Sequence, residues 1–152
     1  MEVSTTMAFI NKYVVCYPPD NEDNVMITRY TTCLSDRVGI NIIYRDTGFY
    51  HSHPWGFISV ILWGGYKESI IKFNTEIKIW RGVGSIAYRP YNLMHTIEVP
   101  KKAITLFIRG KQKVKSTKVV YDGAVMSDTK MMMKQGFTKA QIKQYVKNLI
   151  GK

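Results

Sequence analysis

Short runs of β-branched and aromatic residues recur through the middle of the chain, and this pattern limits the fold more than any other feature. Between residues 38 and 121 the runs are separated by Gly, Pro and Asn at intervals of roughly ten residues, as in a β-sandwich or β-barrel. Period-two alternation occurs in Ile40/Ile42/Tyr44, Ile77/Ile79, His95/Ile97/Val99 and Ile104/Leu106/Ile108. Because successive side chains of a strand point to opposite sides, each strand should have one inward face.

The end of the chain changes from strand to helix periodicity. Thr138 and Gln141 form a T-x-x-Q capping box, and a shorter helix is expected over 129–135, closed by Gly136. After the box, apolar residues follow the stripe of an amphipathic helix at Ile142, Tyr145, Val146, Leu149 and Ile150. We therefore expect a single all-β domain over 1–152, with a barrel core at about 38–121 and a helical C-terminal extension over 127–152.

Positive charge is concentrated in the same C-terminal segment. The net charge is +11, and residues 111–152 hold ten lysines against two aspartates, which places +8 of it there. Lys139, Lys143 and Lys147 recur on one helix face. Two interpretations stay open, a surface that attracts nucleic acid and a solvated face that keeps the protein soluble. We favour the second, because no aromatic residues interleave with these lysines for base stacking.

Three features of the sequence predict the cellular compartment of the protein. No apolar run approaches the ~20 residues that cross a bilayer. The first residues contain Glu2 and no basic segment before an apolar stretch, unlike a signal peptide. Cys16 and Cys33 are the two cysteines, and they suggest no disulfide framework. We expect a cytoplasmic protein that does not contact a membrane.

The three histidines are the candidate metal ligands. His51 and His53 are two residues apart, which in a strand places both rings on one face, roughly 6.6 Å apart along the chain. His95 opens an alternating run directly after a turn-rich stretch. Three imidazoles on one ion leave positions for water or substrate, the arrangement of a catalytic site. Core or surface histidines with satisfied hydrogen bonds are the alternative, and spacing alone does not decide between the two.

The surrounding residues carry a family resemblance. The stretch GFYHSHPWGF at 48–57, followed by Gly64-Gly65-Tyr66, resembles the first motif of the cupin superfamily. Its H-x-H-P-W…G-G-Y pattern is similar to that of small, often phage-encoded cupin proteins. Residues 84–95 and 104–110 resemble the second motif and the strand after it. The resemblance implies a jelly-roll β-barrel that binds one divalent ion (Fe, Zn, Mn or Ni) through His51, His53 and His95. For a phage protein, the compartment would be the cytoplasm of the infected bacterium.

The chain departs from the cupin pattern at one ligand position. Cupins commonly have a glutamate four or five residues after the second histidine, where this chain has Phe57 and Ile58. Asp46, Glu68 and Glu98 are candidate substitutes, although Glu98 alternates away from His95 and should face outward. The remaining three histidines resemble those of three-His cupin dioxygenases and of some hydrolytic or isomerase-like sites. A barrel that has lost its metal is the alternative.

These features together favour a mononuclear metal-dependent enzyme acting on a small polar or nucleotide-like substrate. No catalytic acid or base is identified. Arg89, Tyr88, Trp55 and Tyr66 are candidate substrate contacts because they lie close to the motifs in sequence. The alternative is a non-catalytic cupin module, such as a phage accessory protein that binds a ligand, nucleic acid or a host protein. A homodimer is compatible with both hypotheses.

Overall fold

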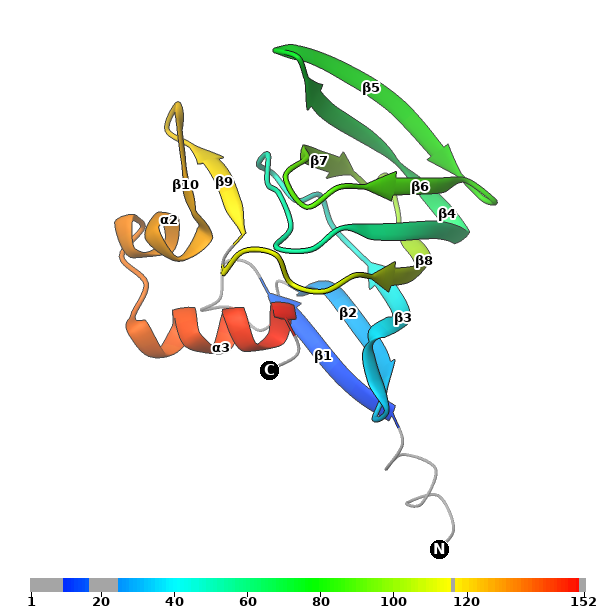
Figure 1. Cartoon of the computed structure of the whole chain (residues 1–152), viewed down its shortest axis with the longest axis horizontal. Helices are drawn as coiled ribbons and strands as arrows, with labels where there is room; N and C mark the ends of the chain where they lie inside the picture. The colour runs from blue at the N-terminus through cyan, green and yellow to red at the C-terminus, as the bar shows by residue number, and fades with distance from the viewer. Residues whose placement is uncertain (1–9, 17–24, 116, 151–152) are drawn as a thin grey trace, which may run out of the picture.

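The computed structural model describes residues 10–16, 25–115 and 117–150, and strands dominate this part of the chain (Figure 1). The strands are β1 (Ile10–Cys16), β2 (Val25–Thr32), β3 (Ser35–Ile43), β4 (Phe57–Lys72), β5 (Thr75–Gly82), β6 (Ile86–Arg89), β7 (Met94–Glu98), β8 (Ala103–Arg109), β9 (Lys118–Tyr121) and β10 (Ala124–Ser127). The helices are α2 (Asp128–Lys134) and α3 (Lys139–Ile150).

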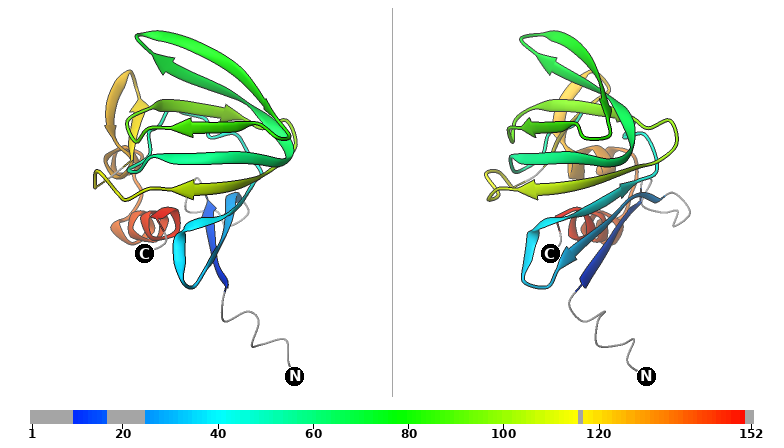
Figure 2. Two further views of the ribbon diagram at one scale, coloured as in Figure 1. Left: turned by 45° about the vertical axis from the view of Figure 1, so that its right-hand side comes forward. Right: turned by 90° about the vertical axis from the view of Figure 1, so that its right-hand side faces the viewer.

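Antiparallel pairing joins these strands around one interior. The main sheet has the order β1-β2-β3-β8-β4-β5, and β6 and β7 also pair with β4, while β9 and β10 form a separate hairpin. The views in Figure 2 show the strands curving around the interior, with both helices gathered at one end. The predicted all-β barrel with a short helical C-terminal extension is confirmed.

Strand β4 links the two halves of the barrel. Its first half pairs with β8 and β6, and its second half pairs with β5 and β7. Gly64 stands between the halves with a φ of 72°, which a residue with a side chain rarely adopts. Gly64 and Gly65 interrupt the run of β-branched and aromatic residues, but the residues on both sides of them form one bent strand of 16 residues.

Inward and outward faces follow the expected alternation, although the apolar face is not always the inward one. In β7 the alternating set points inward, and His95, Ile97 and the nearby Val99 are buried. In β3 and β8 the interior is instead lined by Asn41, Ile43, Thr105 and Phe107. The isoleucine-rich sets of these two strands therefore face outward.

The helical extension begins as predicted. Gln141 N–H donates to Thr138 Oγ1 over 3.2 Å, and Thr138 N–H donates to Gln141 Oε1 over 2.8 Å, so the capping box is present. Ile142 is buried with Met131, Met132 and Val15 in a cluster between the helices and β1. The side chains of Tyr145, Val146, Leu149 and Ile150 lie outside the described residues. In the described part of the chain, no helix is long and apolar enough to span a bilayer.

Candidate metal centre

All three histidines meet inside the barrel. Each contributes a ring nitrogen, and these nitrogens lie within 4.8 Å of one another. His51 is held by reciprocal backbone hydrogen bonds of 2.9 Å with His95 on β7, rather than by a regular strand. His53 follows in the irregular segment before β4, and its Nε2 lies 3.1 Å from His95 Nε2. The expected convergence is therefore present, although His51 and His53 do not share a strand.

Hydrogen bonds determine which nitrogens face the cluster. His95 Nδ1 lies 2.8 Å from Glu68 Oε1, and His51 Nδ1 lies 3.2 Å from the carbonyl oxygen of Phe49. A carboxylate and a carbonyl only accept hydrogen bonds, so both Nδ1 atoms carry the proton. The lone pair of each ring is then on Nε2, the atom available to an ion.

Burial keeps the three imidazoles neutral. Loss of solvent, with the neighbouring His95, lowers the pKa of His51 from 6.5 to about 3. Loss of solvent also lowers the pKa of His53, together with His51 and His95, and lowers that of His95 despite the opposing effect of Glu68. Metal ligation requires unprotonated imidazole, and these rings hold that form at neutral pH.

The donor set fits a divalent transition metal. Two nitrogens bound to one tetrahedral zinc at ~2.1 Å lie roughly 3.4 Å apart, close to the spacing of His53 and His95. Imidazole donors suit zinc, iron, copper and nickel, whereas magnesium and calcium prefer oxygen. The carboxylate beyond His95 matches the common carboxylate–histidine–metal relay, which orients a ligand and raises its basicity.

Glu68 is the centre of a buried hydrogen-bond network next to the histidines. It is 0% exposed, and it accepts hydrogen bonds from Arg89 Nε (2.5 Å), Arg89 Nη2 (2.9 Å) and Arg81 Nε (2.9 Å), besides His95. Arg89 also donates to Ser59 and Tyr66. Burial alone would raise the pKa of Glu68, but the hydrogen bonds from His95 and Arg89 hold it well below its usual range. Glu68 therefore orients the candidate ligand His95. The cluster of candidate ligand atoms consists of the three histidine nitrogens and does not include Glu68.

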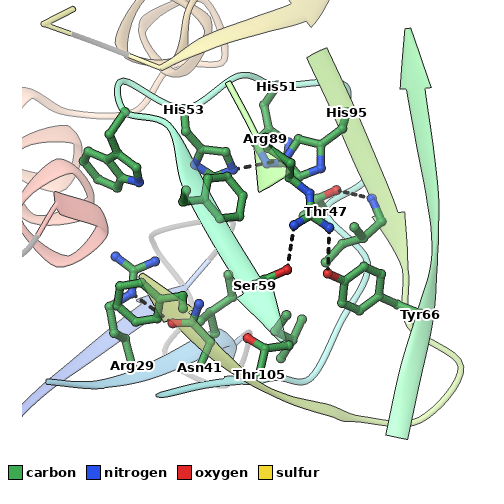
Figure 3. Close-up of a pocket in the computed structure, with 16 residues that line it drawn as sticks. Arg29, Asn41, Thr47, His51, His53, Ser59, Tyr66, Arg89, His95 and Thr105 are labelled. Atoms are coloured by element: carbon green, nitrogen blue, oxygen red, sulfur yellow. Dashed lines mark hydrogen bonds between the residues drawn. The ribbon is translucent and has the colours of Figure 1, made fainter. Parts of the chain in front are cut away.

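A cavity of about 70 Å³ opens beside the histidines. A water needs ~10–15 Å³ of such space, so the cavity has room for a ligand of only a few non-hydrogen atoms. In Figure 3 the histidines lie at one end of the pocket, and Arg29 with Asn41 lies at the other. Arg29 Nε donates to Asn41 Oδ1 over 2.9 Å, and its guanidinium carbon is 4.7 Å from the Phe107 ring centroid. Burial, followed by the nearby Arg109, lowers the pKa of Arg29 to about 10, which leaves it cationic at neutral pH.

The candidate substrate contacts divide between the two sides of the barrel wall. Trp55, Tyr66 and Arg89 line the pocket, and the Arg89 guanidinium engages Glu68, Ser59 and Tyr66. Tyr88 points outward from β6 and is 68% exposed. The structure therefore brings three of the four together with the histidines.

The other charged candidates lie away from the cluster. Asp46 accepts a hydrogen bond from the backbone of Val99, and Glu98 faces outward as predicted, next to Lys67. Lys139, Lys143 and Lys147 are exposed on α3.

Sequence reasoning missed Arg29 and Asn41, because neither belongs to a motif. One signal was available in the spacing. Arg29 is two residues from Ile27 in β2, and Asn41 is two residues from Ile43 in β3, so each polar residue lies on the same strand face as an apolar one. A polar residue in phase with inward apolar ones marks a candidate for the barrel interior.

Comparison with known proteins gives likenesses of fold at low sequence identity. No protein-family model and no curated protein sequence matches the chain. Among solved structures, it is similar to the Drosophila melanogaster CENP-C cupin domain, at a TM-score of 0.49 and 13% identity over 66% of this chain and 76% of that one. It is also similar to hydroxypropylphosphonic acid epoxidase from S. wedmorenis, at a TM-score of 0.48 and 7% identity. That match covers 66% of this chain and 56% of the epoxidase.

The chain's own geometry agrees with the motif resemblance. The strands are antiparallel around one interior, and the histidines of the first motif meet the histidine of the second there. The chain thus has a cupin-type β-barrel fold with a three-histidine cluster inside it.

Proposed function

We propose that the chain is a mononuclear metal-dependent enzyme that acts on a small anionic substrate. The convergence of three neutral imidazoles in a buried pocket is the observation that carries this proposal. His51, His53 and His95 would hold the ion, and Glu68 would orient His95. A bound ion would supply Lewis-acid activation of a substrate oxygen or of water.

The far end of the pocket suggests the substrate class. Arg29 places a buried positive charge there, with Asn41 fixing the direction of its guanidinium. A guanidinium matches the geometry of a carboxylate or a phosphate-like group. The small cavity favours a compact acid over a nucleotide. Trp55, Phe57 and Tyr66 also line the pocket and would exclude water from the bound molecule.

A binding protein without turnover is the second candidate. Among the described residues, no aspartate or glutamate lines the pocket, so no carboxylate is placed there as a general base. Such a protein would retain the metal and the anion but convert no substrate. Product analysis of the metal-loaded protein with a panel of small acids separates the two candidates.

Metal retention is the first test. Protein stripped of metal, then incubated with Fe(II), Zn(II), Mn(II) or Ni(II) and desalted, should retain about one ion of at least one of these metals per chain. At a hundredfold excess over Kd, binding should stabilise the fold by ~2.7 kcal/mol and raise Tm by roughly 5–10 °C. His51→Ala and His95→Ala should abolish both effects, whereas the surface variant Glu98→Gln should keep them. Wild-type protein without bound metal, or alanine variants that retain it, would refute the site.

Charge selectivity is the second test. Calorimetric titration of metal-loaded protein should detect propionate but not its neutral isostere, propionamide. Arg29→Gln should weaken propionate binding roughly 10- to 100-fold, because it removes a charge-assisted hydrogen bond worth ~1.5–3 kcal/mol. Replacement of the exposed Arg45 by Gln is the matched control and should have no effect. Equal binding of the acid and the amide would rule out the anionic substrate class while leaving the metal site intact.

A further inference from the structure

The outward face of the barrel wall carries three aligned rows of apolar side chains. One row runs Tyr88, Ile58, Ile108 and Val38 across β6, β4, β8 and β3. The next runs Ile86, Val60, Leu106, Ile40 and Tyr30 and reaches β2. A third joins Trp63, Ile104 and Ile42. We call this surface the outer apolar face.

No described helix packs on the outer apolar face. Both helices pack at the other end of the molecule, α3 against β1 and α2 against the β9–β10 hairpin (Figures 1 and 2). Ile86 is 69% exposed, and Val38, Ile58, Trp63 and Ile108 are each more than a third exposed. Contiguous apolar patches of several hundred Å² are uncommon on monomers and mark sites of interaction.

The outer apolar face contains no charged residue, and its surroundings are basic. Arg37, Lys101, Lys102 and Lys111 are exposed at the ends of β3 and β8. An apolar centre with a polar, solvated rim is the usual anatomy of a protein–protein interface.

We propose that two copies of this chain pack against each other through the outer apolar face, sheet on sheet. Seven residues of this face are 38–69% exposed. Their combined exposed area is on the order of 800 Å² per copy, which is what each partner contributes to a standard interface. A two-fold dimer uses the same patch on both subunits, so the patch must complement itself. Rows of uncharged aliphatic and aromatic side chains can complement themselves in this way, and the faces of two sheets pack together at ~10 Å.

The proposed dimer is independent of the proposed function, because it would cover the side of the barrel wall opposite the metal centre. Pocket residues alternate along the same strands with residues of the outer apolar face, for example Asn41 between Ile40 and Ile42. The pocket therefore lies on the inner side of this wall, and the dimer would cover its outer side.

Sedimentation velocity of the full chain between 1 and 100 µM tests this proposal. Wild-type protein should be dimeric, and Ile86→Asp should raise the dimer Kd at least a hundredfold, because it would bury an unpaired carboxylate. Tyr88→Asp, also at an exposed position, should act in the same way. Val125→Asp is the matched control, since Val125 is 63% exposed but lies on β10, and it should leave the dimer unchanged.

Salt separates this interface from an electrostatic one. Each copy carries +11, so raising NaCl from 50 to 500 mM should screen the repulsion and tighten the dimer. The free energies of unfolding of Ile86→Asp and Tyr88→Asp should equal that of the wild type when all three proteins are measured at concentrations where they are monomeric. Wild-type protein that stays monomeric at 100 µM in 500 mM NaCl would overturn the proposal, as would equal dissociation by Val125→Asp.

Discussion

Glu68→Gln should lower the free energy of unfolding by about 3–5 kcal/mol, because it leaves the buried charge of Arg89 without its counter-ion. Arg89 is 2% exposed, and it directs both Nε and Nη2 at the Glu68 carboxylate. For a chain of this size, the loss corresponds to a fall in Tm of roughly 6–20 °C. Chemical denaturation of the metal-free protein measures it without a contribution from metal binding.

A matched pair of glutamates controls this experiment. Glu98 also pairs with a cation, but its side chain is 56% exposed and 3.9 Å from Lys67 Nζ. Glu98→Gln should change the stability by no more than about 0.5 kcal/mol, as exposed ion pairs contribute little. Similar losses in the two variants would show that the Glu68 network contributes no more than a surface ion pair.

The effect of Glu68→Gln should depend on pH in one direction. The pKa of Glu68 is held below its ordinary value of 4.5, so the carboxylate stabilises the fold above that pH. As the pH falls below 4.5, the unfolded chain takes up a proton that the folded protein still excludes, and the stabilisation declines. The unfolding free energies of the wild type and of Glu68→Gln should therefore differ by a constant amount above about pH 5.5 and converge in more acidic solution.

The histidines illustrate what the sequence could predict about the site. The H-x-H spacing and the motif around His95 identified the three rings that converge. The sequence named Glu68 only as a candidate replacement ligand, and it did not predict the contacts that Glu68, Arg29 and Asn41 make. Glu68 reaches His95 because β4 and β7 pair, with Glu68 opposite Ile97, and this register is a property of the assembled sheet. Arg29 and Asn41 meet for the same reason, through the pairing of β2 with β3.

The barrel faces show a second boundary of sequence-based prediction. Alternation in β3 and β8 correctly indicated that each strand has two different sides. It did not indicate which side is interior, because the interior of this barrel is a partly polar pocket rather than a purely apolar core. Ile40 and Ile108 face outward although they are apolar, and Asn41 and Thr105 face inward although they are polar. Apolar alternation on two-sided strands therefore locates strands more reliably than it orients them.

The bend in β4 connects fold and site, and replacing Gly64 tests that connection. Gly64 has a φ of 72°, and a Cβ added there would lie 2.0 Å from the backbone oxygen of Lys102. Gly64→Ala should therefore cost about 3–5 kcal/mol, from the strained dihedral together with a clash that backbone atoms relieve poorly. The bend also places Tyr66 and Glu68 beside Arg89 and His95, so metal retention should fall together with stability.

Gly84→Ala is the control for the dihedral alone. Gly84 has a φ of 85°, but an added Cβ meets nothing within 4 Å, so only the conformational cost of roughly 1–2 kcal/mol remains. Urea unfolding of both variants, followed by elemental analysis of the metal-loaded proteins, separates the two contributions. Gly64→Ala could instead be no more destabilising than Gly84→Ala and retain a full complement of metal. That result would show that the close approach of β4 to the start of β8 does not position Glu68 against His95.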